Sequence, residues 1–324
     1  MINSEVEVCF IGNAIVDILS RMSYKTLTKL EVQKGSMQLV DEEISDKILR
    51  HIKNPSIIPG GSAANTAVGF QSFGGKCCFI GQIGNDKFGE LFSKELNNSG
   101  VLFENKNSEV SKKTSKSIVL VTPDAERSMN TFLGASNKFS IDSFDEQFIL
   151  NSRMIYIEGY LFDQPMAKEA IYHCSNLAKS NDKKIALSLS DLFCVDRHRL
   201  DFLNLIEKYV DVIFANEHEI KSLYQLDLIE SINNIKNNVD VGAITLGSKG
   251  SIVFEGKAEH HIDPISVNKL VDTTGAGDLF ASGFLFGFIN KYSIEECGHL
   301  GNKAASEIIK YIGARPKISL KSIL

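Results

Sequence analysis

The most informative segment of the chain is Val271-Asp272-Thr273-Thr274-Gly275-Ala276-Gly277-Asp278, which runs directly into the apolar residues 279–289. Glycines on both sides of an alanine allow a tight turn and leave backbone N–H groups without partners at a helix N-terminus, where the helix dipole favours negative charge. A carboxylate at Asp278 would repel an anion that was merely stored there. The Asp278 carboxylate has a chemical purpose there if it takes a proton from a hydroxyl group that attacks the phosphorus of a phosphate. The alternative is that Asp272 or Asp278 only caps the helix.

A second informative segment is Pro59-Gly60-Gly61-Ser62-Ala63-Ala64-Asn65, at the start of a helix predicted over 62–73. The paired glycines permit close approach of a ligand to the backbone, and the amide of Asn65 can both donate to and accept from hydroxyl groups. Asn13 and Asp17 follow the first predicted strand, 6–11, and ligands of α/β proteins bind at strand carboxyl ends. These residues favour a polyhydroxylated ligand. The alternatives are helix packing at Gly61 and a turn stabilised by Asn13.

Composition excludes several classes of protein. The chain has 324 residues, 43% of them apolar and 23% charged, which is typical of a globular protein and not of a disordered one. A net charge of −5 offers no basic field for nucleic acid. No apolar stretch approaches the roughly 20 residues of a membrane span. Because Glu5 and Glu7 occupy the start of the chain and the six cysteines lack paired spacing, we expect a cytoplasmic protein with reduced thiols.

Short β-branched runs alternate with helical patterns along most of the chain, which predicts an α/β fold with a parallel sheet. The exception is the pair of extended runs 117–122 and 128–132, which have no helix between them and predict a hairpin. Together with a β-like run at 34–40, this hairpin predicts a small separate sheet. We therefore expect a large domain made of 1–13, 41–105 and 135–324, and a small β lid made of 14–40 and 106–134.

Several common catalytic motifs are missing from the sequence. It contains no GxxxxGK[ST] phosphate loop, and the segment at 275–280 lacks the third glycine of a dinucleotide-binding fingerprint. It also contains neither GxSxG nor HExxH. P-loop chemistry, hydride transfer and the commonest hydrolase and metalloprotease mechanisms are therefore disfavoured.

The segments 272–278 and 60–89 resemble the two signatures of the ribokinase-like (PfkB) carbohydrate and nucleoside kinase family, in the family's order. The resemblance extends over essentially the whole chain. The segments 12–17, 127–135 and 189–196 are most similar to bacterial adenosine kinase-type members. The resemblance implies a three-layer α/β/α sandwich with a mostly parallel central sheet and a small β-sheet lid.

The resemblance also implies roles for residues around the acceptor. Asp278 would be the base toward the acceptor hydroxyl, and Gly275, Ala276 and Gly277 would supply amides to the transferring phosphoryl group. The acceptor would be bound by residues after the first strand, at the second glycine segment and on the lid: Asn13, Asp17, Gly61, Asn65 and Arg127. An exposed lid arginine with no ligand is the alternative for Arg127.

On the nucleotide side, the motif Asn216-x-x-Glu219 would organise Mg²⁺, water and the phosphates of ATP, with Glu219 reaching the metal through water. Asn216 also fits a helix N-cap, and the two roles are compatible. The remaining nucleotide-binding residues implied are Thr245, Gly247 and Gly250 beside the phosphates and Asn302 beside the adenine. Members of the family are commonly activated by a monovalent cation, so K⁺ is a candidate cofactor, held by carbonyl groups near residues 312–314.

The function implied is ATP-dependent phosphorylation of the primary hydroxyl of a nucleoside or sugar, with adenosine converted to AMP as the first choice. A fructokinase- or ribokinase-type sugar kinase is the main alternative, and a ligand-binding regulator without turnover is a further one. Phe132 and Phe162 are candidates for an aromatic slot around a nucleoside base, but two aromatic residues in a chain with 20 phenylalanines are more often core residues. The sequence leaves the oligomeric state open between a monomer and a homodimer.

Overall fold

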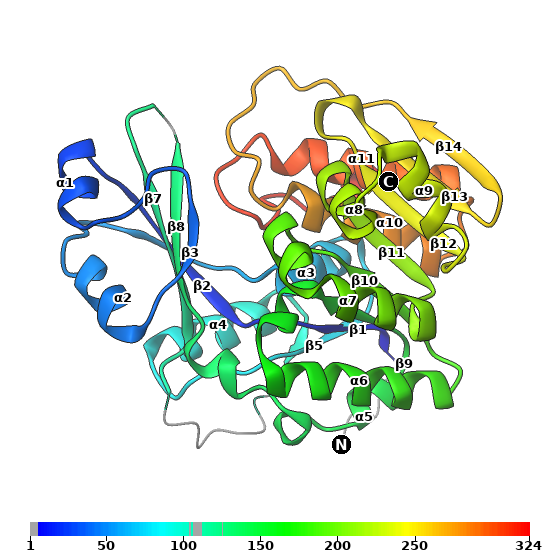
Figure 1. Cartoon of the computed structure of the whole chain (residues 1–324), viewed down its shortest axis with the longest axis horizontal. Helices are drawn as coiled ribbons and strands as arrows, with labels where there is room; N and C mark the ends of the chain where they lie inside the picture. The colour runs from blue at the N-terminus through cyan, green and yellow to red at the C-terminus, as the bar shows by residue number, and fades with distance from the viewer. Residues whose placement is uncertain (1–5, 104, 106–111, 125) are drawn as a thin grey trace.

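The computed structural model describes residues 6–103, 105, 112–124 and 126–324 (Figure 1). Within these residues a nine-stranded sheet has the order β14-β13-β12-β11-β10-β9-β1-β5-β6. Its strands are β1 (Val6–Ile11), β5 (Cys77–Ile80), β6 (Leu102–Phe103), β9 (Ser152–Glu158), β10 (Lys184–Ser188), β11 (Val212–Asn216), β12 (Val241–Thr245), β13 (Ser251–Glu255) and β14 (Ala258–Ile262). The pairs from β6 to β12 are parallel, and β13 and β14 are added antiparallel at one edge.

Helices cover both faces of this sheet because successive side chains of each buried strand point to opposite faces. In β1, Cys9 and Ile11 pack in one core with α5 (Gln147–Leu150), α6 (Pro165–Ser180), α7 (Leu192–Tyr209), α8 (Glu217–Tyr224) and α9 (Leu228–Ile235). Val8 and Phe10 pack in the opposite core with α3 (Ser62–Phe73), α4 (Lys87–Asn98), α10 (Ala276–Ile289) and α11 (Ile294–Ile308). The expected three-layer α/β/α fold is confirmed.

A second sheet of five strands, within the described residues, stands beside the first in the order β3-β8-β7-β2-β4 (Figure 1). Its strands are β2 (Ile15–Arg21), β3 (Met37–Leu39), β4 (Ser56–Pro59), β7 (Ser115–Val121) and β8 (Arg127–Phe132). Two helices, α1 (Tyr24–Lys29) and α2 (Glu42–Leu49), supply Leu27 and Ile48 to a core with Ile118 and Leu120. The β7–β8 hairpin is antiparallel as predicted. We call residues 14–59 and 115–132 the lid.

The first segment of the lid begins at residue 14 as predicted but ends later than the predicted residue 40. The prediction assigned 41–105 to the large domain, but β4 pairs antiparallel with β2, with Val16 opposite Pro59. The chain therefore leaves the lid only at the Gly60-Gly61 turn that starts α3. Local patterns did not reveal β4 because its partner lies about forty residues earlier in the sequence. Residues 1–5, 104, 106–111 and 125 of that division lie outside the described residues.

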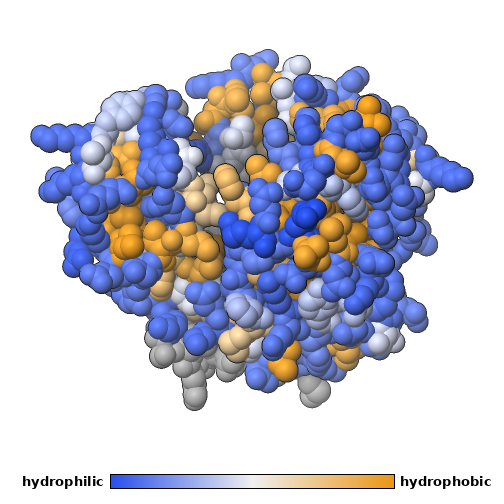
Figure 2. All heavy atoms as spheres, in the orientation of Figure 1, coloured by the Kyte–Doolittle hydropathy of each residue, from blue (hydrophilic) through white to orange (hydrophobic). Residues whose placement is uncertain are grey.

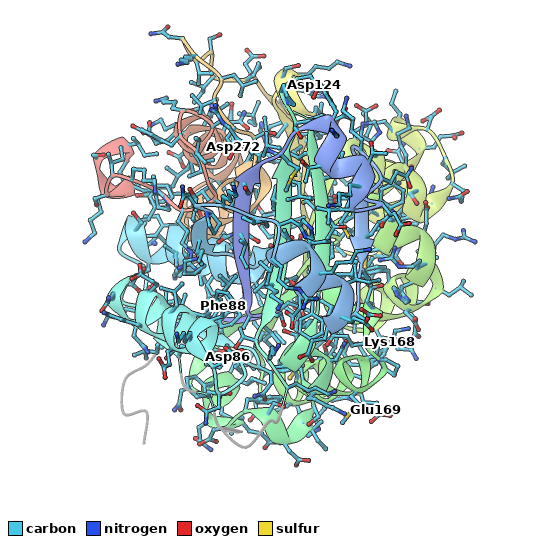
Figure 3. All side chains as sticks on the ribbon, turned by 90° about the vertical axis from the view of Figure 1, so that its left-hand side faces the viewer. Asp86, Phe88, Asp124, Lys168, Glu169 and Asp272 are labelled. Atoms are coloured by element: carbon cyan, nitrogen blue, oxygen red, sulfur yellow. The ribbon has the colours of Figure 1, made fainter. Side chains whose placement is uncertain are left out.

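Asp86 connects the start of the lid hairpin to helix α4, near the end of the lid opposite Asp124 (Figure 3). As the N-cap of α4, it accepts a hydrogen bond from the amide of Gly89 at 2.9 Å. It also accepts hydrogen bonds from the amide and the hydroxyl of Thr114, at 2.9 and 2.7 Å, just before β7 begins. The cap of one helix thus fixes the start of the lid hairpin.

Short 3₁₀ helices complete the described chain: η1 (Gly134–Lys138), η2 (Ile141–Ser143), η3 (Gly159–Asp163), η4 (Gly247–Lys249) and η5 (Leu320–Ile323). Across the described ranges, no helix has both the length and the apolar composition needed to cross a membrane. All six cysteines are buried free thiols.

Candidate active site

The N-terminus of α10 is formed by the first glycine-rich segment. Gly275 is the N-cap, with φ of 78°, and Ala314 packs where a Cβ on Gly275 would stand. Ala276 donates to the Thr273 carbonyl, but the amides of Gly275, Gly277 and Asp278 donate to no acceptor in the described part of the chain. A Cβ on Gly277 would meet nothing within 4 Å, so this residue faces open space. The helix therefore starts with unpaired donors beside an open volume, which suits an anion.

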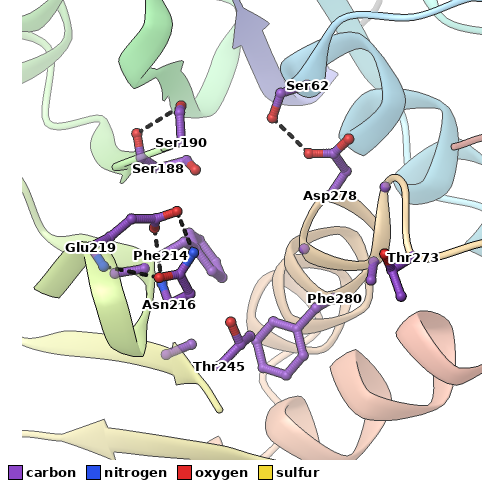
Figure 4. A pocket seen from close by; sticks show the side chains of 15 residues that line it. Ser62, Ser188, Ser190, Phe214, Asn216, Glu219, Thr245, Thr273, Asp278 and Phe280 are labelled. Atoms are coloured by element: carbon purple, nitrogen blue, oxygen red, sulfur yellow. Dashed lines mark hydrogen bonds between the residues drawn. The ribbon is translucent and has the colours of Figure 1, made fainter. Parts of the chain in front are cut away.

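Asp278 is held by two residues of α3, of which Figure 4 shows Ser62. The Ser62 hydroxyl donates to its Oδ1 at 2.6 Å, and the Asn65 side-chain amide donates to its Oδ2 at 3.0 Å. Burial raises the pKa of Asp278 to about 6, and these two hydrogen bonds oppose that rise. Its carboxylate does not cap α10, because Gly275 occupies the cap and no side chain bonds there. Asp278 is thus a fixed, buried carboxylate with a raised pKa.

Asp272 stabilises the loop before α10. Its two oxygens accept from the amides of Thr274 and Gly313, each at 2.9 Å. It also forms an ion pair of 2.7 Å with Arg127 of the lid. Although burial favours the protonated acid, hydrogen bonds from Gly313, Arg127 and Thr274 hold the pKa of Asp272 below its usual value. Asp272 therefore joins the glycine-rich segment to the C-terminal loop and to the lid.

Two cavities of about 230 and 270 Å³ meet at Asp278. The residues that line both cavities are Ser62, Ser190, Gly275 and Asp278. The smaller lies over the carboxyl ends of β10, β11 and β12, and the larger lies between the lid and the large sheet, where the surface is hollowed in Figure 2. A buried carboxylate and unpaired amides thus lie where the two cavities meet.

The smaller cavity contains three of the residues predicted to bind nucleotide: Asn216, Glu219 and Thr245 (Figure 4). Asn216 caps α8, its Oδ1 accepting from the Glu219 amide at 2.9 Å, while the Glu219 carboxylate accepts from the backbone and side-chain amides of Asn216 at 2.9 and 2.5 Å. Burial raises the pKa of Glu219 to about 7, partly offset by the Asn216 amide. The N-cap alternative for Asn216 is therefore correct, and the pair also faces the cavity.

Gly247, Gly250 and Asn302 do not line this cavity. The Asn302 amide donates to the carbonyls of Ile262 and Asp263 at 3.3 and 2.9 Å, and its oxygen accepts from the Ser251 hydroxyl. Gly250, with φ of 88°, leaves room for the Ile262 carbonyl, which would lie 2.0 Å from a Cβ. Asn302 and Gly250 hold the β13–β14 edge of the sheet, whereas Gly247 has open space around it.

The larger cavity contains four of the residues predicted to bind the acceptor: Asn13, Asp17, Gly61 and Asn65. Asp17 comes from β2 of the lid, and its carboxylate fills the space beside Gly60, where a Cβ would stand 2.2 Å from Oδ2. Burial raises the pKa of Asp17 to about 7. The fifth predicted residue, Arg127, does not line the cavity and instead bonds Asp272 and the Thr274 hydroxyl.

One face of the lid gives this cavity an apolar wall. Alternate residues of the lid strands point toward it. They include Ile15, Met37, Leu39 and Met129, together with Leu133 just after β8. Leu39 and Met129 are 50% and 38% exposed, although both are large apolar side chains. The cavity therefore has a polar floor on the large sheet and, on the lid, an apolar wall that also carries the polar side chains of Asp17, Ser117 and Thr131.

The sequence interpretation overlooked Glu158, a buried residue at the carboxyl end of β9 that also lines the larger cavity. Its carboxylate accepts from the backbone and side-chain amides of Asn13, at 3.3 and 3.0 Å, and from the Ala63 amide at 2.8 Å. Burial raises its pKa to about 7, and these hydrogen bonds oppose the rise. Gln164 donates to the Asn13 Oδ1 at 2.8 Å. The sequence signal that could have identified Glu158 is its position as a lone carboxylate at the end of a mainly apolar strand.

Phe132 and Phe162 are not pocket residues. Phe162 is fully buried in the core with its ring centroid 4.5 Å from that of Phe202, and Phe132 lies beneath the ammonium group of Lys116. The aromatic side chain that does line the larger cavity is Tyr160. Both residues are therefore core residues, the alternative that was favoured over an aromatic slot, and most of the twenty phenylalanines lie in the two large cores.

A divalent cation would find few protein ligands here. No group of three or more metal-binding side chains occurs among the described residues. Mg²⁺ commonly keeps several waters and binds through one or two carboxylates together with substrate phosphates. The buried carboxylate of Glu219 in the smaller cavity fits that mode and does not fit a dedicated protein cage.

The chain is similar to several named kinases. It is 30% identical to the adenosine kinase of Saccharomyces cerevisiae, with 94% of each chain covered, and 28% identical to that of Dictyostelium discoideum, with 96% of each covered. It is also 31% identical to the ribokinase of Lactococcus lactis, over 82% of this chain and 84% of the relative.

Solved structures agree with these similarities. The adenosine kinase of Sinorhizobium meliloti superposes with a TM-score of 0.92 at 37% identity, and a probable sugar kinase of Rhizobium etli with 0.92 at 38%. Both superpositions cover 99% of this chain and 98% of the other. Residues 35–320 match the pattern of the pfkB family carbohydrate kinases. Together with the paired cavities around Asp278, these matches show that the chain belongs to the pfkB family of carbohydrate kinases.

Proposed function

We propose that this kinase transfers the terminal phosphoryl group of ATP to the primary hydroxyl of a nucleoside, converting adenosine to AMP. Membership of the family makes it a phosphotransferase for nucleosides or sugars. One observation favours a nucleoside: the acceptor-side cavity combines a polar floor with an apolar wall. Asn13, Asp17 and Asn65 suit the hydroxyls of a ribose, and exposed Leu39 and Met129 suit the faces of a flat base.

In this proposal Asp278 accepts the proton of the attacking hydroxyl. Ser62 and Asn65 hold its carboxylate in place by their two hydrogen bonds. The unpaired amides of Gly275, Gly277 and Asp278 stabilise negative charge on the oxygens of the transferring group, since they are fixed before the reaction begins. As the acceptor oxygen bonds to phosphorus, the bond from phosphorus to ADP breaks and the acceptor proton passes to Asp278.

The nucleotide occupies the smaller cavity in this proposal. When bound, ATP supplies the phosphoryl group and Mg²⁺ neutralises charge on its terminal phosphates. Glu219 and Asn216 orient the water shell of the metal, and Thr245 lies beside the phosphates. Arg127 takes a different role from the predicted one: through Asp272 it holds the lid against the glycine-rich segment, which keeps water from competing as the acceptor.

Activation by K⁺ remains a prediction, and the loop at 312–314 is where we expect the ion to bind. The loop at 312–314 contacts the glycine-rich segment through Gly313, which donates to Asp272, and Ala314, which packs against Gly275. Carbonyl groups of both segments are therefore close together. Comparing initial rates in KCl and NaCl of equal ionic strength tests this cofactor.

A sugar kinase is the second candidate. The similarity to a ribokinase favours it, and so does Glu158, which adds a carboxylate to the polar floor of the cavity. A ligand-binding regulator is disfavoured because a pure binder needs neither a buried base nor unpaired amides at its side.

The decisive experiment measures ADP release from MgATP with adenosine, ribose, fructose or no acceptor, each followed by identification of the phosphorylated product. We expect adenosine to accelerate ADP release by far the most and to yield AMP. Acceleration by a sugar alone would replace this proposal with the second candidate. Equal rates with every acceptor and with none would exclude both kinases, and the Asp278→Asn variant serves as the background control.

A further inference from the structure

The C-terminal loop between α11 and η5 contacts the site through three consecutive residues. The Gly313 amide donates to Asp272 at 2.9 Å, and Ala314 packs against Gly275. Arg315 donates through Nε to the side-chain oxygen of Asn65 at 3.4 Å. Neither cavity is lined by Arg315, so its guanidinium lies behind the residues that do line them.

The contact with Arg315 determines which way the amide of Asn65 points. Guanidinium has only donors, so it selects the oxygen of an amide and repels the NH₂ group. With its oxygen held by Arg315, Asn65 turns its NH₂ toward Asp278 and donates to Oδ2 at 3.0 Å. The reversed amide would lose both hydrogen bonds. Arg315 therefore acts on the orientation of Asp278 through one intermediate side chain.

Arg315 also provides a positive charge near Asp17. The charged groups that act on Asp17 are Arg315 from the C-terminal loop, Asp278 from α10 and Arg127 from β8. Arg127 is already paired with Asp272 at 2.7 Å, whereas Nη2 of Arg315 is buried and has no hydrogen bond within the described residues. Burial lowers the pKa of Arg315 to about 10, against the opposing charges of Asp17 and Glu95. The guanidinium therefore stays charged at neutral pH.

Packing gives the guanidinium a fixed place. Its central carbon lies 6.0 Å from the ring centroid of Phe92, a fully buried residue of α4. A cation over an aromatic face is attracted by the ring and is held away from bulk water. The position of Arg315 is thus set by α4 and by the loop, independently of any ligand.

We propose that Arg315 is a positioning residue for the acceptor site, which fixes the amide of Asn65 toward Asp278 and supplies a positive charge behind the cavity that Asn65 and Asp17 line. This inference rests on the proposed function, because it assigns Asp17, Asn65 and Asp278 to the acceptor. Arg315 touches neither ligand in this scheme and acts only through those three residues.

The test compares Arg315→Met, Arg315→Lys and the control Lys317→Met, which removes an exposed charge from the same loop. With the acceptor that the wild type uses, we expect Arg315→Met to raise the acceptor KM about tenfold, to lower kcat and to move the acid limb of kcat/KM up by about one pH unit. The KM for ATP should stay within about twofold of the wild type, and Lys317→Met should match the wild type in every parameter. Calorimetric binding of ADP shows that each variant is folded.

Arg315→Lys separates the two roles. Lysine keeps the charge but lacks the planar fork, so the acid limb should return toward the wild-type position while kcat stays low. An unchanged acid limb and acceptor KM in folded Arg315→Met would overturn the inference. Equal effects on the KM of ATP and of the acceptor would overturn it as well, because they indicate general disturbance of the site.

A measurement without any substrate keeps this inference separate from the proposed function. Carboxyl ¹³C NMR titration, with Asp17 assigned by the Asp17→Asn variant, follows the ionisation of Asp17 directly. We expect its midpoint to rise by about one pH unit in Arg315→Met and not in Lys317→Met. No shift would refute the role of Arg315 even if the kinase assay succeeds. A shift would support that role even if every tested acceptor fails.

Discussion

Helices α3 and α10 begin in the same way and meet at Asp278, yet their N-termini are used differently. Each follows a glycine in the positive φ region, Gly61 at 88° and Gly275 at 78°, and neither has a side-chain cap. At α3, the Ala63 amide is already bonded to the carboxylate of Glu158 at 2.8 Å. At α10, the amides of Gly277 and Asp278 have no partner among the described residues.

The difference shows how one structural device can serve two purposes. A protein carboxylate occupies the anion position at α3, so this helix start becomes a rigid platform for Ser62 and Asn65. The anion position at α10 is open. The space around the glycines differs in the same way. A Cβ on Gly61 would lie 2.4 Å from the Asn13 carbonyl, so protein atoms fill that position, whereas a Cβ on Gly277 would meet nothing within 4 Å.

The largest expected effect comes from removing the group at which the two helices meet. We expect Asp278→Asn to lower kcat by about 10²- to 10⁴-fold, because it removes proton transfer while preserving shape. Dissociation constants for ADP and for the acceptor should change by less than about threefold. Rapid-quench turnover together with calorimetry provides the measurement. A folded variant with turnover close to the wild type would refute the assignment of Asp278 as base.

The next effect tests whether the space at α10 is reserved for a ligand. Gly277→Ala places a methyl group in open space, so we expect kcat/KM for ATP to fall roughly 10- to 100-fold by displacement of the phosphates. Thermal stability should be unchanged or slightly higher, since alanine favours a helix. The control is Gly283→Ala in the same helix, where a Cβ would lie 2.6 Å from the Leu300 carbonyl. That control should lose stability instead, and full activity of Gly277→Ala would mean that no ligand occupies this space.

A third prediction concerns the occupied N-terminus of α3. Glu158→Ala leaves the backbone amides of Asn13 and Ala63 without an acceptor, so we expect the free energy of unfolding to fall by at least about 2 kcal/mol. The matched control is Glu7→Ala, which removes an exposed carboxylate that accepts from the Lys76 amide at 2.8 Å. Water replaces that bond, so the loss should stay below about 1 kcal/mol. Equal losses in urea denaturation would show that the Glu158 contacts have no special value.

The smallest expected effect is a shift in pH dependence. Ser62→Ala removes one of the two hydrogen bonds that lower the pKa of Asp278 from its burial-raised position. We therefore expect the acid limb of kcat, near pH 6 in the wild type, to move up by less than about one pH unit. A limb that moves down would contradict the donor role of Ser62.

The same raised pKa affects stability. Because the pKa of Asp278 rises from 3.8 in the unfolded chain to about 6 in the folded one, protonated Asp278 favours the fold below pH 4. That contribution disappears as the pH rises through about 6. The wild type should therefore lose stability relative to Asp278→Asn between pH 4 and 7, as unfolding curves at each pH would show.

Local patterns in the sequence determined the fold class, the two glycine-led helix N-termini and the lid hairpin of this protein. The alternation of β-branched runs and amphipathic helices predicted an α/β fold with a parallel sheet, because strands and helices have side-chain periods of two and 3.6 residues. The three-layer arrangement was implied by the family resemblance. The glycine-rich segments predicted two helix N-termini, because only particular residues permit such turns and leave amides unpaired. Ser62–Phe73 and the hairpin of β7 and β8 were found where expected. The family resemblance rests on the same local segments.

Tertiary structure alone decided which distant side chains complete those segments. Glu158 and Ala63 are 95 residues apart, and Arg315 and Asn65 are 250 residues apart, so no local period connects either pair. Asn302, predicted to lie beside a nucleotide, donates to the carbonyls of Ile262 and Asp263 at the end of β14. A side chain's role depends on which partners remain unpaired around it after the chain has folded. The periodicity of the sequence specifies which face of each helix or strand is apolar and where the chain turns. The burial of a polar side chain and its hydrogen-bond partners are decided only when the helices pack on the sheet.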